Sequence, residues 1–265
     1  MTLGHIADLA DQGIRSVEIE GLRLAYTVTG SGPPAVLVHG LGGSGRWWAP
    51  VVPDLARDHT VHVLDLVGFG ASANQPFSLE SAALQVAAFM DAIGISDALV
   101  VGHSMGGLIC GELAADRPDL VDRLVLVNAC GLPFRRSLVE HALCLVRSTL
   151  GSPRAFLQLA AADTLRAGPL TLIRATRSVL ASDLSAKLAR IRAPTLVLWG
   201  EHDPLIPAAT GRALAQALVD GSFAIVEGAG HSPMWERPER FSRRLREFIR
   251  ARRARVARSP ATANV

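Results

Sequence analysis

Short segments made almost only of apolar residues recur along the chain, and glycine-rich or polar residues bound each of them. These segments lie at residues 35–38, 61–64, 98–101, 124–127, 195–199 and 223–226. Strands that are buried on both faces of a parallel sheet have such continuous apolar runs, because helices cover both sides of the sheet. The pattern therefore predicts a central sheet whose strands are mostly parallel.

Helical patterns lie between these predicted strands. Apolar residues recur at helical spacing over residues 79–93, and residues 108–115 are typical of a second helix that ends before Pro118. Strands that alternate with helices indicate a parallel sheet with helices on both faces. Residues 16–29 differ, because their apolar positions predict two strands around a turn at Gly21.

The alternation stops at residues 132–189, which contain helical patterns but no convincing strand. The helical stretches lie at residues 138–146, 156–165 and 170–180, with glycine and proline between them. A helical insertion between two strands predicts a cap over the carboxyl edge of the sheet, where ligands bind in open α/β sheets. We therefore predict three parts: a core formed by residues 1–131 and 190–254, a cap at 132–189, and a flexible tail at 255–265.

Composition and charge exclude several classes of protein. Of the 265 residues, 49% are hydrophobic and 19% are charged, which is a globular composition and not a disordered one. The net charge is +3, and arginines are concentrated between Arg243 and Arg258. This cluster could bind nucleic acid, but no nucleic-acid motif and few aromatic residues accompany it. We expect instead the solvated face of a last helix, and no nucleic-acid partner.

Targeting and redox signals are weak. No apolar run is long enough to span a membrane, and the first residues, which include Asp8 and Asp11, do not resemble a signal peptide. We expect a cytoplasmic protein without a membrane span. The three cysteines, Cys110, Cys130 and Cys144, lack the spacing of a metal site, so we expect reduced thiols and neither a metal nor a cofactor.

Ser104 is the candidate nucleophile. It lies in Gly102-His-Ser104-Met-Gly106, which follows a buried strand and begins a helix. A turn this tight leaves no room for side chains two residues on either side of the serine. The helix N-terminus also favours negative charge that develops there. A glycine-rich turn with an incidental serine is the alternative, and the strand and helix around the motif argue against it.

A serine hydroxyl needs a base, and His231 is the candidate. It follows the last predicted strand, so its loop should lie at the same edge of the sheet as Ser104. The alternative is a histidine in a surface loop. His103 neighbours Ser104 in sequence, but adjacent residues on such a turn are expected to point apart.

The base needs a carboxylate that accepts from the imidazole, and Asp203 is the candidate. It lies in a turn after the strand that ends at Trp199, and it completes the chain order serine, aspartate, histidine. Glu201 in the same loop is the rival. Asp203 could also simply form the turn before Pro204.

The loop after residues 35–38 supplies the remaining site residues. The N–H groups of Leu41 and Met105 are the candidate donors to an oxyanion. His39 is expected to hold this loop by hydrogen bonds, and His39 and Gly40 are predicted to lie beside the substrate. Trp47 and Trp48 could line the pocket, or they could pack their helix on the core.

Several motifs together resemble the α/β-hydrolase superfamily over most of the chain. They are His39-Gly-Leu-Gly-Gly43, Asp65-Leu-Val-Gly-Phe-Gly70, Gly102-His-Ser-Met-Gly-Gly107, Gly200-Glu-His-Asp-Pro204 and Gly228-Ala-Gly-His231. The resemblance is to small bacterial esterases, lactonases and carbon–carbon bond hydrolases with a short helical cap. It implies the α/β-hydrolase fold and a Ser104–His231–Asp203 triad. The family usually has proline where Val67 stands.

The resemblance also bears on the reaction. Dehalogenases and epoxide hydrolases of this fold use an aspartate nucleophile, whereas Ser104 implies an acyl-enzyme. Some relatives carry the acid one strand earlier, where this chain has Asn128 and Cys130 and no carboxylate. This supports Asp203 as the acid.

Three functions are open from the sequence. The first is hydrolysis of a small-molecule ester, lactone or thioester. The second is a carbon–carbon bond hydrolase or lyase that acts on an anionic substrate, because an arginine of the cap could bind a carboxylate, although exposed helix faces explain these arginines better. The third is a non-catalytic ligand receptor, against which the complete set of three side chains argues. The oligomeric state is left open.

Overall fold

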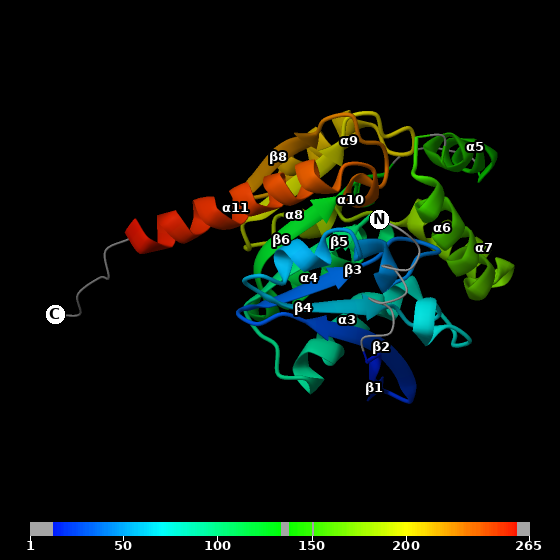
Figure 1. Cartoon of the computed structure of the whole chain (residues 1–265), viewed down its shortest axis with the longest axis horizontal. Helices are drawn as coiled ribbons and strands as arrows, with labels where there is room; N and C mark the ends of the chain where they lie inside the picture. The colour runs from blue at the N-terminus through cyan, green and yellow to red at the C-terminus, as the bar shows by residue number, and fades with distance from the viewer. Residues whose placement is uncertain (1–12, 134–137, 150, 259–265) are drawn as a thin grey trace.

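The computed structural model describes residues 13–133, 138–149 and 151–258. These residues form one sheet of eight strands in the order β1-β2-β4-β3-β5-β6-β7-β8, flanked by helices (Figure 1). The strands are β1 (Arg15–Ile19), β2 (Leu22–Thr29), β3 (Pro34–Val38), β4 (Thr60–Asp65), β5 (Ala98–His103), β6 (Val121–Val127), β7 (Thr195–Gly200) and β8 (Gly221–Val226).

The sheet is mostly parallel, as the apolar runs predict. From β4 to β8 every neighbouring pair is parallel, and only the pairs β1–β2 and β2–β4 are antiparallel. Every residue of β5 and β7 is buried, because helices cover both faces there. The carboxyl ends of the parallel strands therefore meet at one edge, where their loops converge.

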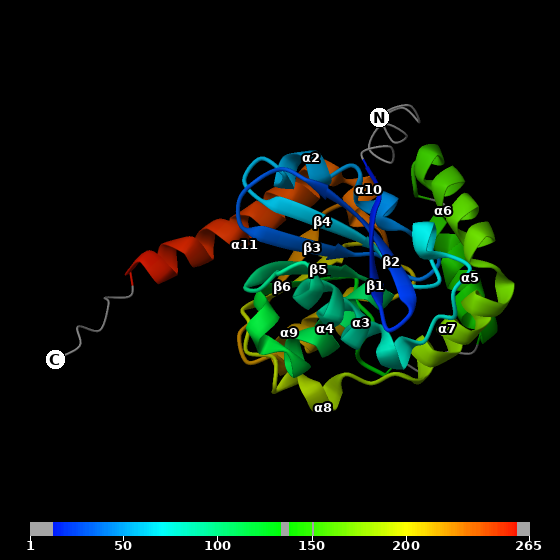
Figure 2. The ribbon, with the colours of Figure 1, turned by 90° about the horizontal axis from the view of Figure 1, so that it is seen from below.

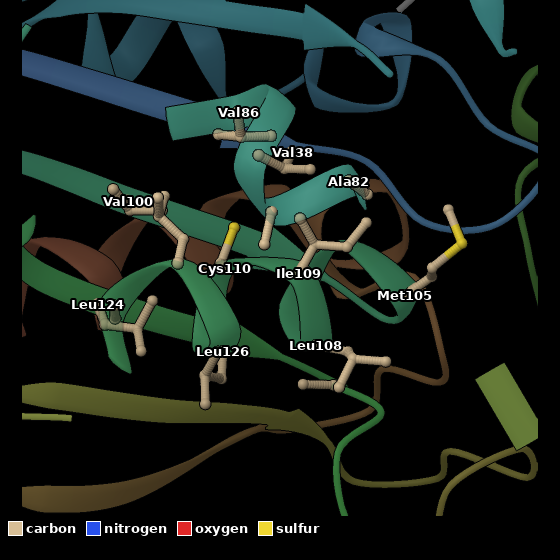
Figure 3. Close-up of a cluster of buried hydrophobic side chains, with 14 of the residues drawn as sticks. Val38, Ala82, Val86, Val100, Met105, Leu108, Ile109, Cys110, Leu124 and Leu126 are labelled. Atoms are coloured by element: carbon tan, nitrogen blue, oxygen red, sulfur yellow. The ribbon is translucent and has the colours of Figure 1, made fainter. Parts of the chain in front are cut away.

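Two hydrophobic clusters lie on the two faces of the sheet. Figure 3 shows part of the first, in which Ile109 and Val86 lie over Val38, Val100 and Leu126 of the strands. The helices on this face are α3 (Leu79–Ala92), α4 (Met105–Asp116), α8 (Ser185–Leu188) and α9 (Ala208–Ala217). On the opposite face lie the short helix η1 (Gly45–Trp48), α2 (Val52–Leu55), α10 (Pro233–Glu236) and α11 (Pro238–Arg258). Two further single turns are η2 (Gly70–Ser72) and η3 (Pro118–Leu120).

Besides α8, three helices lie between β6 and β7, as the helical patterns predict. They are α5 (Leu138–Thr149), α6 (Arg154–Ala167) and α7 (Pro169–Ala181). Figures 1 and 2 show them together at one end of the molecule, whereas α11 extends from the other end. We refer to α5, α6 and α7 as the cap. Gly168, at a φ of 78°, separates α6 from α7.

The ends of the chain add two observations. Helix α11 continues to Arg258, so residues 255–258 of the predicted tail are helical, and residues 259–265 lie outside the described residues. None of the helices in the described ranges combines the length and the apolar character that crossing a bilayer requires.

Candidate functional site

Ser104 lies at the tight turn between β5 and α4. Its φ is 53°, a value that residues other than glycine rarely adopt. The two glycines around it are required by space: a Cβ atom at Gly102 would lie 2.3 Å from the carbonyl oxygen of Gly106, and one at Gly106 would lie 2.5 Å from that of Val38. The turn thus places the hydroxyl at the carboxyl edge of the sheet and at the N-terminus of α4.

The structure brings together Ser104, His231 and Asp203. The Nε2 atom of His231 lies 3.1 Å from the Oγ of Ser104, and its Nδ1 lies 2.8 Å from the Oδ2 of Asp203. All three side chains are buried. With Nδ1–H donating to the carboxylate, Nε2 has a free lone pair that can accept the proton of the hydroxyl. The three loops after β5, β7 and β8 therefore form one chemical unit.

Asp203 is held by four hydrogen bonds. Its Oδ1 accepts the N–H groups of Leu205 and Ile206, and its Oδ2 accepts from His231 and from the side chain of Asn128. Burial alone would raise the pKa of this carboxyl. The charge of His231 and these hydrogen bonds outweigh burial and hold the pKa below its ordinary value. The group is therefore a carboxylate at neutral pH.

Glu201, the rival acid, lies elsewhere. Its side chain is exposed and accepts the N–H of Gly228 at 2.8 Å. It stabilises the turn after β8, whereas the Nδ1 of His231 is bonded to Asp203.

Asn128 is a site residue that sequence reasoning missed. It ends β6 with a φ of 43°, a conformation that asparagine tolerates better than most residues. Its Nδ2 donates to the Oδ2 of Asp203 at 2.5 Å, and its Oδ1 accepts the N–H of Gly200 at 3.1 Å. In the sequence this position only shows that no carboxylate follows β6. In the structure its amide connects Asp203 to the end of β7.

The loop that carries His231 is held from several sides. The Glu236 carboxylate accepts the N–H groups of Gly230 and Ser232, the two neighbours of His231. The carbonyl of His231 accepts from His103 Nε2 at 2.8 Å. Glu236 lies five residues after His231, at the end of the single-turn helix α10. A carboxylate so soon after a loop histidine was a signal that could have identified it.

His103 is hydrogen-bonded to the backbone of His231 and not to Ser104, but its side chain also lines the site. Its ring centroid lies 5.0 Å from that of His231, and the side chain is fully buried. Burial, aided by the nearby His231, lowers the pKa of His103 to about 3. His103 is therefore neutral, and it holds the loop of His231 without adding a second positive charge.

The two candidate oxyanion donors lie at the same edge. Leu41 and Met105 both line the cavity beside Ser104, and neither of their N–H groups is hydrogen-bonded within the described part of the chain. His39 holds the loop: its Nδ1–H donates to the carbonyl of Gly40, and its Nε2 accepts the N–H of Leu66. Burial lowers the pKa of His39, which agrees with this neutral ring.

A cavity of about 590 Å³ opens beside Ser104 under the cap. Trp47 lines it, but Trp48 does not, because Trp48 is fully buried and packs against Phe241. His39 and Gly40 also lie outside the lining, so their predicted place beside the substrate is not observed. Most of the lining is apolar and includes Val146, Phe156, Leu157, Leu172, Val179, Leu205 and Ile206.

Asp163 of α6 connects the cap to the core and was also missed. Its buried carboxylate accepts from the Ser44 hydroxyl at 2.7 Å and from the Trp47 indole at 3.1 Å, and it forms an ion pair with Arg46. Asp163 is one of the few acids among the arginines of the cap, which is visible in the sequence, but its partners are more than 110 residues away. Among the described residues, no group of three histidine, cysteine or acidic side chains could hold a metal ion.

The similarities to known proteins extend over most of the chain. Residues 35–244 match the model of the alpha/beta hydrolase family. A protein of Pseudomonas savastanoi pv. phaseolicola, provisionally named carbamate hydrolase RutD, is 34% identical over 248 residues, which cover 83% of this chain and 94% of that protein. A pimeloyl-acyl-carrier-protein methyl ester esterase of Photobacterium profundum is 31% identical over 255 residues, with coverage of 86% and 98%.

A solved structure extends the similarity to the fold. It is that of a membrane phospholipase A, a bacterial virulence factor, which is 29% identical and superposes with a TM-score of 0.78. The match covers 95% of this chain and 90% of the other. The chain therefore belongs to the alpha/beta hydrolase family, and its activity is that of a hydrolase.

Proposed function

We propose that this protein is a serine hydrolase that cleaves uncharged carboxylic esters with an apolar acyl chain. The observation that carries the proposal is the hydrogen-bonded series from Ser104 through His231 to Asp203, beside a cavity with an apolar lining. Ser104 would supply the nucleophile, His231 the general base and Asp203 the charge that stabilises the protonated base. The reaction follows from the positions of the donors and acceptors.

Ser104 is the nucleophile in the proposed mechanism. Its Oγ attacks the ester carbonyl while Nε2 of His231 takes the hydroxyl proton. Asp203, still a carboxylate, stabilises the imidazolium that forms. The oxyanion accepts from the N–H groups of Leu41 and Met105, and each such donor typically contributes about 3 kcal/mol to transition-state stabilisation. The imidazolium then protonates the departing alcohol, and water releases the acyl group by the same steps.

The lining of the cavity indicates the substrate class. Within the described ranges it includes no aspartate, glutamate, lysine or arginine. An anionic substrate would lose its hydration there without gaining a partner, which is costly. A cavity of roughly 150 Å³ can already hold benzene, so about 590 Å³ accommodates an acyl chain of several carbons.

The similar proteins support an ester more than a small polar substrate. Two of them are named as a methyl ester esterase and a phospholipase A, and both names describe ester cleavage. Another relative is provisionally named a carbamate hydrolase, and a carbamate is a small polar group for which this cavity is large and apolar. The alternative with an anionic substrate has no support from the lining, because none of the cap arginines in the described ranges is part of it.

The test is hydrolysis of p-nitrophenyl butyrate, octanoate and laurate, together with labelling by a fluorophosphonate. The wild-type protein should cleave the octanoate best and should be labelled once, at Ser104. Ser104→Ala should lose both properties, with a loss of roughly 10⁶-fold in kcat. Thr176→Ala is the matched control, since Thr176 lines the same cavity and forms no hydrogen bond with the triad in the described part of the chain. Absence of both turnover and labelling in the wild type would refute the proposal and favour the receptor.

A further inference from the structure

The cap exposes most of the large apolar side chains that lie on the surface. Exposed leucine, isoleucine and valine side chains in the described residues are Ile14, Leu84, Leu143, Val146, Leu165, Leu170, Ile173 and Val219. Five of the eight belong to α5, α6 and α7, and Leu165 is 82% exposed. Single apolar residues on a surface are ordinary, but a concentration on one element indicates a binding surface.

Exposed arginines accompany these apolar side chains on the same three helices. They are Arg147, Arg154, Arg166, Arg174 and Arg177. Within the described ranges, none of them forms an ion pair, whereas several arginines of the core do, among them Arg46, Arg117 and Arg246. The acids of these three helices do not balance them, because they are only Glu140 and Asp163, and Asp163 is buried in its pair with Arg46. The outer side of the cap is thus both apolar and cationic.

The two kinds of side chain alternate closely along the chain. Val146 precedes Arg147, Leu165 precedes Arg166, and Ile173 precedes Arg174. Figures 1 and 2 show that α5, α6 and α7 together form one end of the molecule, which leaves this end accessible. Val146 also lines the cavity beside Ser104, so the exposed surface is continuous with the place where the acyl chain would lie.

We propose that the outer side of the cap binds the surface of an anionic lipid membrane and receives its ester substrate there. Apolar side chains insert into the interfacial region, and arginines attract the acidic headgroups. A second copy of this chain fits less well, because two caps would oppose arginine to arginine. The role in substrate delivery rests on the proposed esterase function, whereas binding to the membrane does not.

The experiment measures binding of the full chain to lipid vesicles by co-sedimentation. The protein carries Ser104→Ala, so that no lipid is hydrolysed during the measurement. Vesicles of phosphatidylglycerol and phosphatidylcholine are compared with vesicles of phosphatidylcholine alone. Tighter binding to the anionic vesicles is expected, and it should weaken as salt is added.

Two sets of substitutions locate the binding surface. Arg147→Gln, Arg174→Gln and Arg177→Gln together should weaken binding to anionic vesicles roughly 100-fold, at about 1 kcal/mol for each arginine. Leu165→Ser, Leu170→Ser and Ile173→Ser together should weaken it by at least about tenfold. The matched control is Leu84→Ser with Val219→Ser, which removes exposed apolar side chains outside the cap and should leave binding unchanged.

The possible results separate this proposal from its alternatives. Equal loss in the control, or equal binding to both kinds of vesicle, would overturn it. The surface would be assigned to a second copy if the protein did not bind vesicles and formed a dimer instead. That dimer should dissociate in the triple variant Leu165→Ser, Leu170→Ser and Ile173→Ser. With Ser104 restored, both sets should hydrolyse dissolved p-nitrophenyl butyrate normally. Vesicle binding without any ester turnover would refute the proposed function but not the surface.

Discussion

Glu236 lies directly behind His231 and fixes its loop through the backbone. Its carboxylate accepts the N–H groups of the residues before and after the histidine. A hydrogen bond to a charged acceptor is stronger than one between neutral groups, so this clamp restricts the position of the imidazole. It also reaches the cap, because the Ser152 hydroxyl lies 3.5 Å from the same carboxylate.

Replacing Glu236 should therefore impair catalysis through His231. Glu236→Gln keeps one acceptor but turns an amide N–H₂ toward a backbone N–H, which leaves a buried donor unsatisfied. We expect a loss of about 1–3 kcal/mol in stability and a fall in kcat of at least tenfold, with a small change in KM. The measurements are ester kinetics and urea unfolding. Glu239→Gln, an exposed glutamate three residues further along in α11, is the control; a similar loss of kcat there would contradict the clamp.

Asn128 should behave as a positioning residue for Asp203. In Asn128→Asp, two carboxyl groups would share the place where the Asn128 amide and Asp203 now meet at 2.5 Å. One of them should remain protonated near neutral pH, because two adjacent negative charges repel. The variant should lose more stability at about pH 8 than at about pH 5, relative to the wild type. Urea unfolding at both pH values tests this, and a loss independent of pH would count against it.

His103 should make stability depend on pH. Its pKa is about 3 in the folded protein and 6.5 ordinarily. Between these two pH values the unfolded chain binds a proton at this ring, whereas the folded protein does not. Stability from this group is therefore complete above about pH 6.5 and is lost progressively as the pH falls toward 3. His103→Gln retains a donor for the carbonyl of His231 but does not titrate.

The size of this effect can be measured by urea unfolding at about pH 7 and about pH 4.5. The wild type should lose roughly 2–3 kcal/mol more than His103→Gln between these values. If the wild type and His103→Gln lose the same free energy of unfolding between these pH values, the imidazole of His103 is not the group that titrates.

The width of the cavity should set the preferred acyl chain. Ala161 lines the cavity, whereas the neighbouring Ala162 does not. Ala161→Phe should lower kcat/KM for p-nitrophenyl laurate about tenfold relative to the butyrate, because the ring occupies space that the longer chain needs. Ala162→Phe should leave the ratio of the two esters unchanged. If both variants shift the ratio alike, the acyl chain does not lie in this part of the cavity.

The fold could be predicted because its main features leave local marks in the sequence. Burial of β5 and β7 on both faces requires uninterrupted apolar residues, and the turn at Ser104 excludes side chains at Gly102 and Gly106. Such constraints act on residues that are neighbours in sequence, so they can be recognised from the sequence alone. The meeting of His231 and Asp203 with Ser104 followed from the shared edge of parallel strands.

The remaining parts of the site depend on contacts between distant residues. Asn128 is defined by its bonds to Asp203 and Gly200, about 70 residues further along the chain, and an asparagine after a strand has many other uses. Trp47 and Trp48 are adjacent in a short helix. Which of them faces the cavity depends on the rotation of that helix about its axis, which sequence spacing does not determine.

The cap occupies a connection that the sheet needs in any case. Strands β6 and β7 are parallel neighbours, so the chain that leaves β6 at Val127 must cross to the opposite edge before β7 begins at Thr195. Lengthening such a crossover costs only about 0.6 kcal/mol for each doubling. The helices that cover the cavity can therefore be exchanged for others while the strand ends that carry Ser104, Asp203 and His231 keep their places, which would let substrate choice and surface affinity evolve separately from the chemistry.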